Sequence, residues 1–113
     1  MKIGLIRCLQ TETVCPAFKC IKVIAEQEDA FSEIKEETTL LGITTCGGCP
    51  GKNAVLRAAN LVKMGAQAIA LASCIGKGSP TPIGMTCPHF AVMKAAIEKK
   101  VGPQVRVFEY THN

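Results

Sequence analysis

The feature that most constrains this chain is a nearly unbroken apolar run, AQAIALASC, at residues Ala66–Cys74. A half-buried strand alternates apolar and polar side chains, whereas a run that is apolar at almost every position is typical of a strand covered on both faces. Such strands belong to parallel sheets, in which helices connect one strand to the next and pack on the two faces. The run therefore predicts the central strand of an α/β fold.

The segments around this run complete an α/β pattern. Short apolar stretches predict three more strands, at Lys2–Cys8, Thr38–Thr45 and Val105–Tyr110. Apolar positions at helical spacing predict three helices, at Ala17–Ala30, Lys52–Met64 and Phe90–Lys100. The alternation predicts a small, doubly wound, four-stranded parallel sheet of the flavodoxin or Rossmann type, with strand order 2-1-3-4. At 113 residues, we expect one domain spanning residues 1–113.

Charge and composition argue against some partners. The chain carries thirteen Lys and Arg against nine Asp and Glu, and these charges are spread along the helices rather than gathered in a stripe. It has no Trp and one Tyr, so we do not expect an aromatic surface that stacks bases. The apolar amino terminus is too short for a signal peptide or a membrane span. We therefore expect a cytoplasmic protein that binds neither nucleic acid nor membranes.

Seven cysteines are the second constraint. An odd number cannot all pair within one chain, and without an export signal we expect a reducing compartment, so metal binding or thiol chemistry is favoured over a disulfide scaffold. In doubly wound sheets, ligands bind beyond the carboxyl ends of the strands. The candidate metal ligands all fall there: Cys8, Cys46 and Cys74 at the ends of the first three predicted strands, Cys49 in the loop after the second, Cys87 and His89 at the start of the third helix, and His112 after the fourth strand.

Three cysteines precede proline where a loop meets a predicted helix: Cys15-Pro16, Cys49-Pro50 and Cys87-Pro88. Because proline favours the first helical position, we expect each cysteine at or beside a helix N-cap. The helix dipole favours an anion there, which lowers the pKa of a thiol and raises its thiolate fraction. Thiolates are the form of cysteine that binds metals and performs redox chemistry.

The motif Cys46-Gly47-Gly48-Cys49 lies at the centre of the expected site. Its spacing fits both a metal half-site and a thioredoxin-type redox pair, and the two glycines allow a tight turn that points both sulfurs inward. Zinc takes four ligands with sulfur about 2.3 Å from the metal, whereas an iron–sulfur cluster spans more space. Both remain open. Cys15 and Cys20 have no assigned role, since cysteine often acts only as a small buried hydrophobe.

The stretch Thr45–Gly51, TCGGCPG, resembles the signature of the CGGC-domain family, a small family of mainly prokaryotic proteins proposed to bind zinc through several Cys and His. The resemblance extends over nearly the whole chain, because the surrounding context is similar at five separated places. These places are Arg7-Cys8, Cys15-Pro16 with Cys20, Leu71–Cys74, Cys87–His89 and Thr111-His112. The resemblance implies a metal-binding domain and names no substrate.

Three functions are compatible with this pattern. The leading prediction is a metal-binding domain that uses Cys46 and Cys49, with some of the other candidate ligands, to hold zinc or an iron–sulfur cluster. The alternative is a thiol–disulfide or redox-sensing protein in which Cys46 or Cys49 is the attacking thiolate. A third is a small-molecule enzyme with a cysteine nucleophile and His89 or His112 as the base. No acid pair or triad indicates a particular reaction, so enzymatic activity stays an open question.

Overall fold

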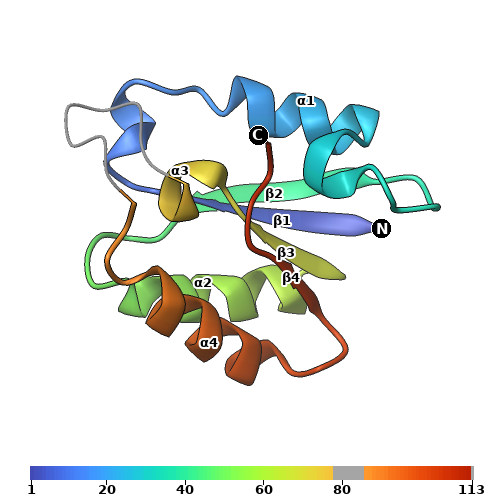
Figure 1. The fold of residues 1–113 in the computed structure, drawn as a ribbon. Coiled ribbons are helices and arrows are strands. Elements are labelled where there is room, and N and C mark those ends of the chain that lie inside the picture. Colours follow the sequence, from blue (N-terminus) through green and yellow to red (C-terminus); the bar gives the residue numbers. More distant parts are fainter. Residues whose placement is uncertain (78–85, 113) are drawn as a thin grey trace.

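The computed structural model describes residues 1–77 and 86–112, and its fold is shown in Figure 1. Its strands are β1 (Lys2–Arg7), β2 (Thr39–Thr45), β3 (Ala68–Leu71) and β4 (Arg106–Phe108). They form one sheet in the order β2-β1-β3-β4, and each neighbouring pair runs parallel. The predicted α/β fold and the strand order 2-1-3-4 are therefore confirmed.

Helices cover both faces of the sheet (Figure 1). In the described ranges the helical elements are η1 (Thr11–Thr13), α1 (Phe18–Glu26), η2 (Asp29–Phe31), α2 (Lys52–Lys63), α3 (Ser73–Gly76) and α4 (Phe90–Val101). One core joins α1 and η2 to the face of β1 that carries Ile3 and Leu5, and the other joins α2 and α4 to the face that carries Ile6. None of these helices is long and apolar enough to cross a membrane.

Two glycines bring α2 close to the sheet. Gly4 of β1 and Gly42 of β2 are partners in the parallel register, and both face Leu61 of α2. A Cβ on Gly4 would lie 2.8 Å from the Leu61 Cδ1 atom, and one on Gly42 would lie 3.3 Å from its Cδ2 atom. Because any larger residue would push the helix outward, these glycines set the distance between α2 and the two strands that approach the cysteine motif.

Two element ends differ from the predicted ones. The first helix ends at Glu26 rather than Ala30, because Gln27 adopts a left-handed conformation (φ 54°) and caps the helix with its N–H on the Val23 carbonyl. The third strand ends at Leu71, and the apolar run continues into α3, which holds Cys74. Hydrophobicity alone cannot distinguish a buried strand from a short buried helix. The sequence also predicts a loop over residues 76–86, which are rich in glycine and proline. Most of these residues lie outside the described part of the chain.

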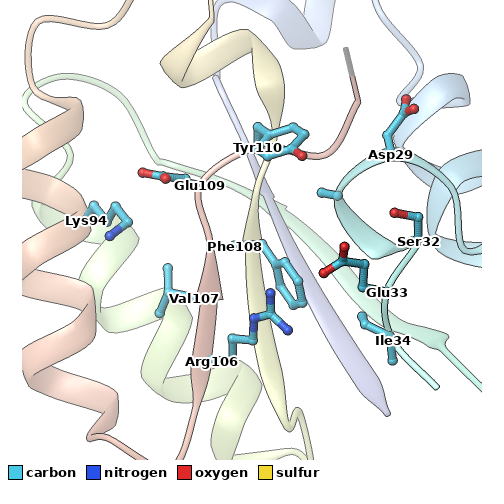
Figure 2. Close-up of a pocket in the computed structure, with 11 residues that line it drawn as sticks. Asp29, Ser32, Glu33, Ile34, Lys94, Arg106, Val107, Phe108, Glu109 and Tyr110 are labelled. Atoms are coloured by element: carbon cyan, nitrogen blue, oxygen red, sulfur yellow. The ribbon is translucent and has the colours of Figure 1, made fainter. Parts of the chain in front are cut away.

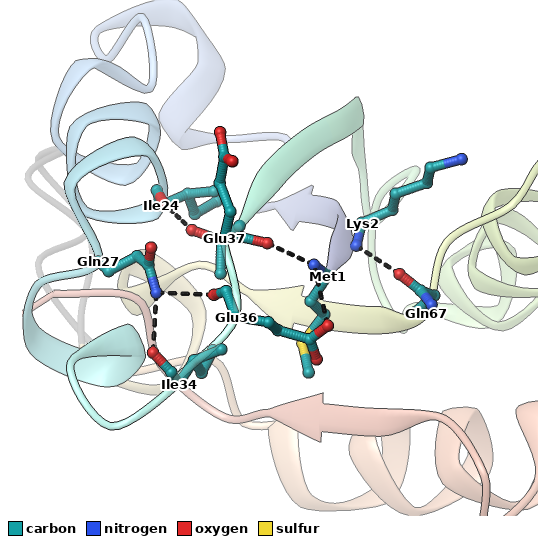
Figure 3. A network of polar contacts seen from close by, with 9 residues as sticks. Met1, Lys2, Ile24, Gln27, Ile34, Glu36, Glu37 and Gln67 are labelled. Atoms are coloured by element: carbon teal, nitrogen blue, oxygen red, sulfur yellow. Dashed lines mark hydrogen bonds and ion pairs between the residues drawn. The ribbon is translucent and has the colours of Figure 1, made fainter.

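A network of polar contacts stabilises the edge of the sheet at which the strands begin (Figure 3). The Gln27 side chain donates hydrogen bonds to the carbonyls of Ile34 (2.8 Å) and Glu36 (2.9 Å). The Lys2 N–H donates to the side-chain oxygen of Gln67 (2.9 Å), whose own N–H donates to the Lys2 carbonyl (2.7 Å). Hydrogen bonds between main chain and side chains therefore hold this edge of the sheet together.

Candidate functional site

A small cavity lies at the carboxyl edge of the sheet, beyond the ends of β1 and β2. Its volume is about 30 Å³, the space of one or two water molecules. Among the described residues that line it, none carries a carboxylate. The lining includes four thiols and one imidazole, from Cys8, Cys46, Cys49, Cys87 and His89. Five of the seven predicted ligands therefore border one space.

The strand register brings the first two thiols together. Arg7 and Thr45 are the last partners of the β1–β2 pair, so Cys8 and Cys46 leave the ends of neighbouring strands side by side. The Cys46 N–H continues the ladder by donating to the Arg7 carbonyl at 2.7 Å. After Cys8 the chain turns into η1, where the Thr11 N–H donates to the Cys8 carbonyl at 3.1 Å. Both thiols are half-buried.

The turn between Cys46 and Cys49 depends on its two glycines. Gly47 and Gly48 have φ angles of +79° and +102°, which residues other than glycine rarely adopt. A Cβ on Gly47 would also lie only 2.6 Å from the Cβ of Asn53 in α2. The predicted tight turn is therefore confirmed. It places Cys46 and Cys49 on the lining of the same cavity, with Cys49 the more exposed of the two.

Hydrogen bonds that involve Arg57 and Thr45 stabilise this turn. One guanidinium nitrogen of Arg57 donates to the carbonyl of Thr45 (3.0 Å) and to its hydroxyl (2.8 Å). The same hydroxyl accepts a hydrogen bond from the Gly47 N–H at 3.2 Å. Sequence reasoning missed this clamp. The only signal was an arginine in the second turn of the helix that follows the motif, which by itself resembles any solvated helix residue.

Cys87 closes the cavity from the side of α4. Its N–H donates to the Ile75 carbonyl at 2.8 Å, so the segment before α4 is fastened to α3. Burial raises the pKa of the Cys87 thiol, and negative charge on Cys49, Cys8 or Cys46 would raise it further. This direction is opposite to the one predicted from a position before a helix, because burial removes hydration from the thiolate.

The three Cys-Pro pairs share one offset from the helix that follows, and this offset differs from the predicted one. The helix N-caps are Ala17, Gly51 and His89, each one residue after the proline. Each proline therefore precedes the N-cap instead of occupying the first helical position, and each cysteine lies two residues before the cap. The repeated offset explains why Cys49 and Cys87 reach the cavity from the loops rather than from the helix ends.

The other predicted ligands lie outside the lining of the cavity. Cys74 was expected at the end of the third strand, but it lies inside α3 and packs against both cores. Burial raises the pKa of its thiol, an effect partly offset by hydrogen bonds from the Cys8 backbone and the Thr11 side chain. The main chain of His112 is bonded to Ser73: its N–H donates to the Ser73 hydroxyl (2.9 Å), which donates to its carbonyl (2.6 Å).

Cys15 and Cys20 belong to a different part of the molecule. Cys20 is 5% exposed in the α1 core, and its sulfur lies 3.2 Å from the hydroxyl of Thr111. Burial raises the pKa of Cys20, although the Thr111 hydrogen bond opposes this. The carbonyl of Cys15 accepts a hydrogen bond from the largely buried guanidinium of Arg7. Both cysteines thus lie with the α1 layer, away from the lining of the cavity.

The donor set suits a thiophilic metal in type and number. Four thiols and an imidazole, with no carboxylate in the described lining, are the ligands that zinc takes in closed sites. In the side-chain positions of this structure, however, no three His, Cys, Asp or Glu residues within the described ranges are arranged to hold one ion. The backbone therefore assembles the donors around one space, and their side chains would have to turn into it to coordinate a metal.

Comparison with known proteins gives one family and one relative. The CGGC-domain family model matches residues 2–112. An uncharacterized protein of Methanocaldococcus jannaschii is 39% identical over 80 residues, a region that covers 66% of this chain and 62% of the relative. The chain thus matches less than two thirds of that relative's length. No solved structure matches the chain.

Proposed function

The chain belongs to the CGGC-domain family, and we propose that it binds a metal ion through the rim thiols, our name for Cys8, Cys46, Cys49 and Cys87. His89 supplies a nitrogen donor at the same cavity. We propose zinc in preference to an iron–sulfur cluster, because the cavity is small, about 30 Å³, and a cluster spans more space. Cys74 and His112 are not needed for a complete ligand set.

One observation carries this proposal. The rim thiols come from the ends of two neighbouring strands, from the glycine turn after β2 and from the segment before α4, yet they line one cavity. Thiols that act only as small buried hydrophobes would not be expected to gather around one cavity. Four sulfur donors that can turn into one cavity are, in contrast, one of the ligand sets that tetrahedral zinc takes.

Two properties of the protein would affect its metal affinity. These are the protonation of the rim thiols and the geometry of the Cys46–Cys49 turn. A metal binds thiolates, so each rim thiol must lose its proton, and the raised pKa of Cys87 makes binding stronger as the pH rises. The clamp from Arg57 to Thr45 holds the Cys46–Cys49 turn before any metal arrives. When bound, zinc would join β1, β2 and the start of α4.

We also infer a cytoplasmic location, where thiols stay reduced.

Metal analysis of anaerobically purified protein tests the proposal. We expect about one zinc per chain and no visible absorption. Iron with labile sulfide and a brown colour would instead support the cluster. Protein that is folded and reduced, and that takes up neither metal on titration, would contradict both.

A second function is favoured by one observation, the exposure of Cys49 beside Cys46 in the same cavity. An exposed thiolate can attack a disulfide, and a nearby thiol can resolve the product. This function expects a reversible Cys46–Cys49 disulfide in protein that takes up no metal. Mass spectrometry of the metal-free protein, before and after oxidation by a disulfide such as oxidised glutathione, distinguishes it from the metal-binding function.

A further inference from the structure

A second, larger cavity lies along the outer edge of the sheet (Figure 2). Its volume is about 380 Å³, within the size range of ligand pockets. One side is formed by the consecutive residues Arg106–Tyr110, which are β4 and the two residues after it. The segment 29–34, which includes η2, forms a second side, and Lys94 of α4 borders it across the strand. We call this space the edge slot.

The edge slot has the form of a space for one more strand. β4 is the outermost strand on its side of the sheet, and the outer N–H and C=O groups of an edge strand point away from its neighbour. Elements from both faces extend past β4, with η2 from the α1 layer and Lys94 from the α4 layer. Beyond β4, the Thr111 carbonyl accepts a hydrogen bond from the Ala30 N–H at 3.3 Å, which closes one end of the slot.

The charges in the slot favour a basic occupant. Three carboxylates, from Asp29, Glu33 and Glu109, line the slot against two cations, Lys94 and Arg106. Lys94 is ion-paired with Glu98 of its own helix at 3.2 Å, so the slot carries more negative than positive charge. Within the described residues, Glu33 and Glu109 have no ion pair, and they lie on opposite sides of β4 (Figure 2). Successive residues of an extended peptide point to opposite sides, so two adjacent lysines would each meet one carboxylate.

We propose that the edge slot binds an extended, lysine-bearing peptide segment of a partner protein, which adds to β4 as a fifth strand. Main-chain hydrogen bonds to β4 would give affinity, and Glu33 and Glu109 would select the charge. The exposed edge would then serve as a binding surface rather than a site of aggregation. This proposal does not depend on metal binding at the rim.

The test is titration of ¹⁵N-labelled protein with the capped peptide Thr-Val-Lys-Lys-Val-Thr, followed by NMR. We expect shifts confined to residues 106–110 and 29–34, and slower hydrogen exchange of β4 amides. The same peptide with N-methylated backbone amides should not bind, because it lacks strand donors. A peptide with two glutamates in place of the lysines should bind more weakly. Glu33→Gln and Glu109→Gln should each weaken the lysine peptide about two- to fivefold, whereas Glu12→Gln, far from the slot, should not.

Several results would overturn the proposal. Equal binding of the N-methylated peptide would exclude strand addition, and equal binding of the glutamate peptide would exclude charge selection. Shifts outside the slot, or no binding at millimolar peptide, would remove the site altogether. Sedimentation that shows concentration-dependent dimers, broken by Glu109→Lys, would instead assign the slot to a second copy of this chain. Metal content does not enter any of these readouts, so failure here leaves the rim proposal intact.

Discussion

The rim thiols and the two thiols of the α1 side, Cys15 and Cys20, are the same residue type in two different settings. The rim thiols border a cavity together with an imidazole. Cys20 is buried in the α1 core, where its sulfur contacts the hydroxyl of Thr111. The first setting leaves sulfur available to a metal, whereas the second already provides the sulfur with a partner. If the rim thiols bind a metal as proposed, the neighbours of a cysteine, and not its place in a Cys-Pro pair, separate binding from packing.

The largest expected effect is a difference in metal affinity between the two groups. The double variant Cys46→Ser/Cys49→Ser removes two of four sulfur donors, so we expect zinc affinity to fall by at least about 100-fold. The matched double variant Cys15→Ser/Cys20→Ser keeps every rim donor and should bind zinc like the unmodified chain. Competition with a chromophoric chelator measures both. Equal losses in the two variants would remove the distinction between the groups.

The next effect concerns the glycine turn that holds the rim. Gly47→Ala adds a Cβ 2.6 Å from the Cβ of Asn53 at a φ of +79°. We expect a loss of about 1–3 kcal/mol in the free energy of unfolding, together with weaker zinc binding. Gly65→Ala is the control, since Gly65 also has a positive φ (+118°) but has no atom within 4 Å of the added Cβ.

Urea denaturation and zinc titration of these two variants separate the causes. Gly65→Ala should lose stability only through its backbone conformation and should keep its zinc affinity. If the two variants lose zinc affinity equally, the turn geometry is not what positions Cys46 and Cys49.

A stability effect without a metal effect is expected on the α1 side. Thr111→Val removes the hydroxyl that contacts the Cys20 sulfur and accepts a hydrogen bond from the Ser73 N–H at 3.2 Å. Leaving that buried N–H unpaired should cost about 1–3 kcal/mol. Thr13→Val, at an exposed position, should cost far less. Chemical denaturation checks the size, and a change in zinc affinity for Thr111→Val would show that the two regions are coupled.

The smallest effect is the pH dependence of the metal-free protein. Burial raises the pKa of Cys20, so the folded chain holds this proton more tightly than the unfolded chain. The resulting stability is fully present below the ordinary thiol pKa of about 8.5 and is lost as pH rises through the higher pKa of the folded state. We expect the free energy of unfolding to fall as the pH rises above about 8.5. Cys20→Ala should flatten that fall, and an unchanged slope would contradict the assignment.

The sheet could be predicted because its signals are local and repeated. Continuous apolar runs marked the strands, helical spacing marked the segments between them, and the strand order followed from standard crossovers. The convergence of Cys8 and Cys46 also followed, since parallel strands end at one edge. The Gly47-Gly48 turn was predictable because a tight reversal requires glycine there.

Other features depend on contacts between distant residues. Cys74 lies in a helix rather than at a strand end, since α3 is fastened through Ser73 to Thr111 and His112, which are 38 and 39 residues later in the chain. The spacing of apolar residues in the sequence gives no indication of these hydrogen bonds. The clamp from Arg57 to Thr45 is likewise a tertiary contact. The raised pKa of Cys87 depends on how much water is excluded, which no motif specifies.

X-ray absorption at the zinc edge of the metal-loaded protein tests the central claim most directly. The rim thiols predict a shell of three or four sulfur atoms at about 2.3 Å, with any remaining ligand a nitrogen at about 2.0 Å, from His89. A shell of only nitrogen and oxygen at about 2.0–2.1 Å, in folded and reduced protein, would contradict the claim, because zinc would then be bound without the rim thiols.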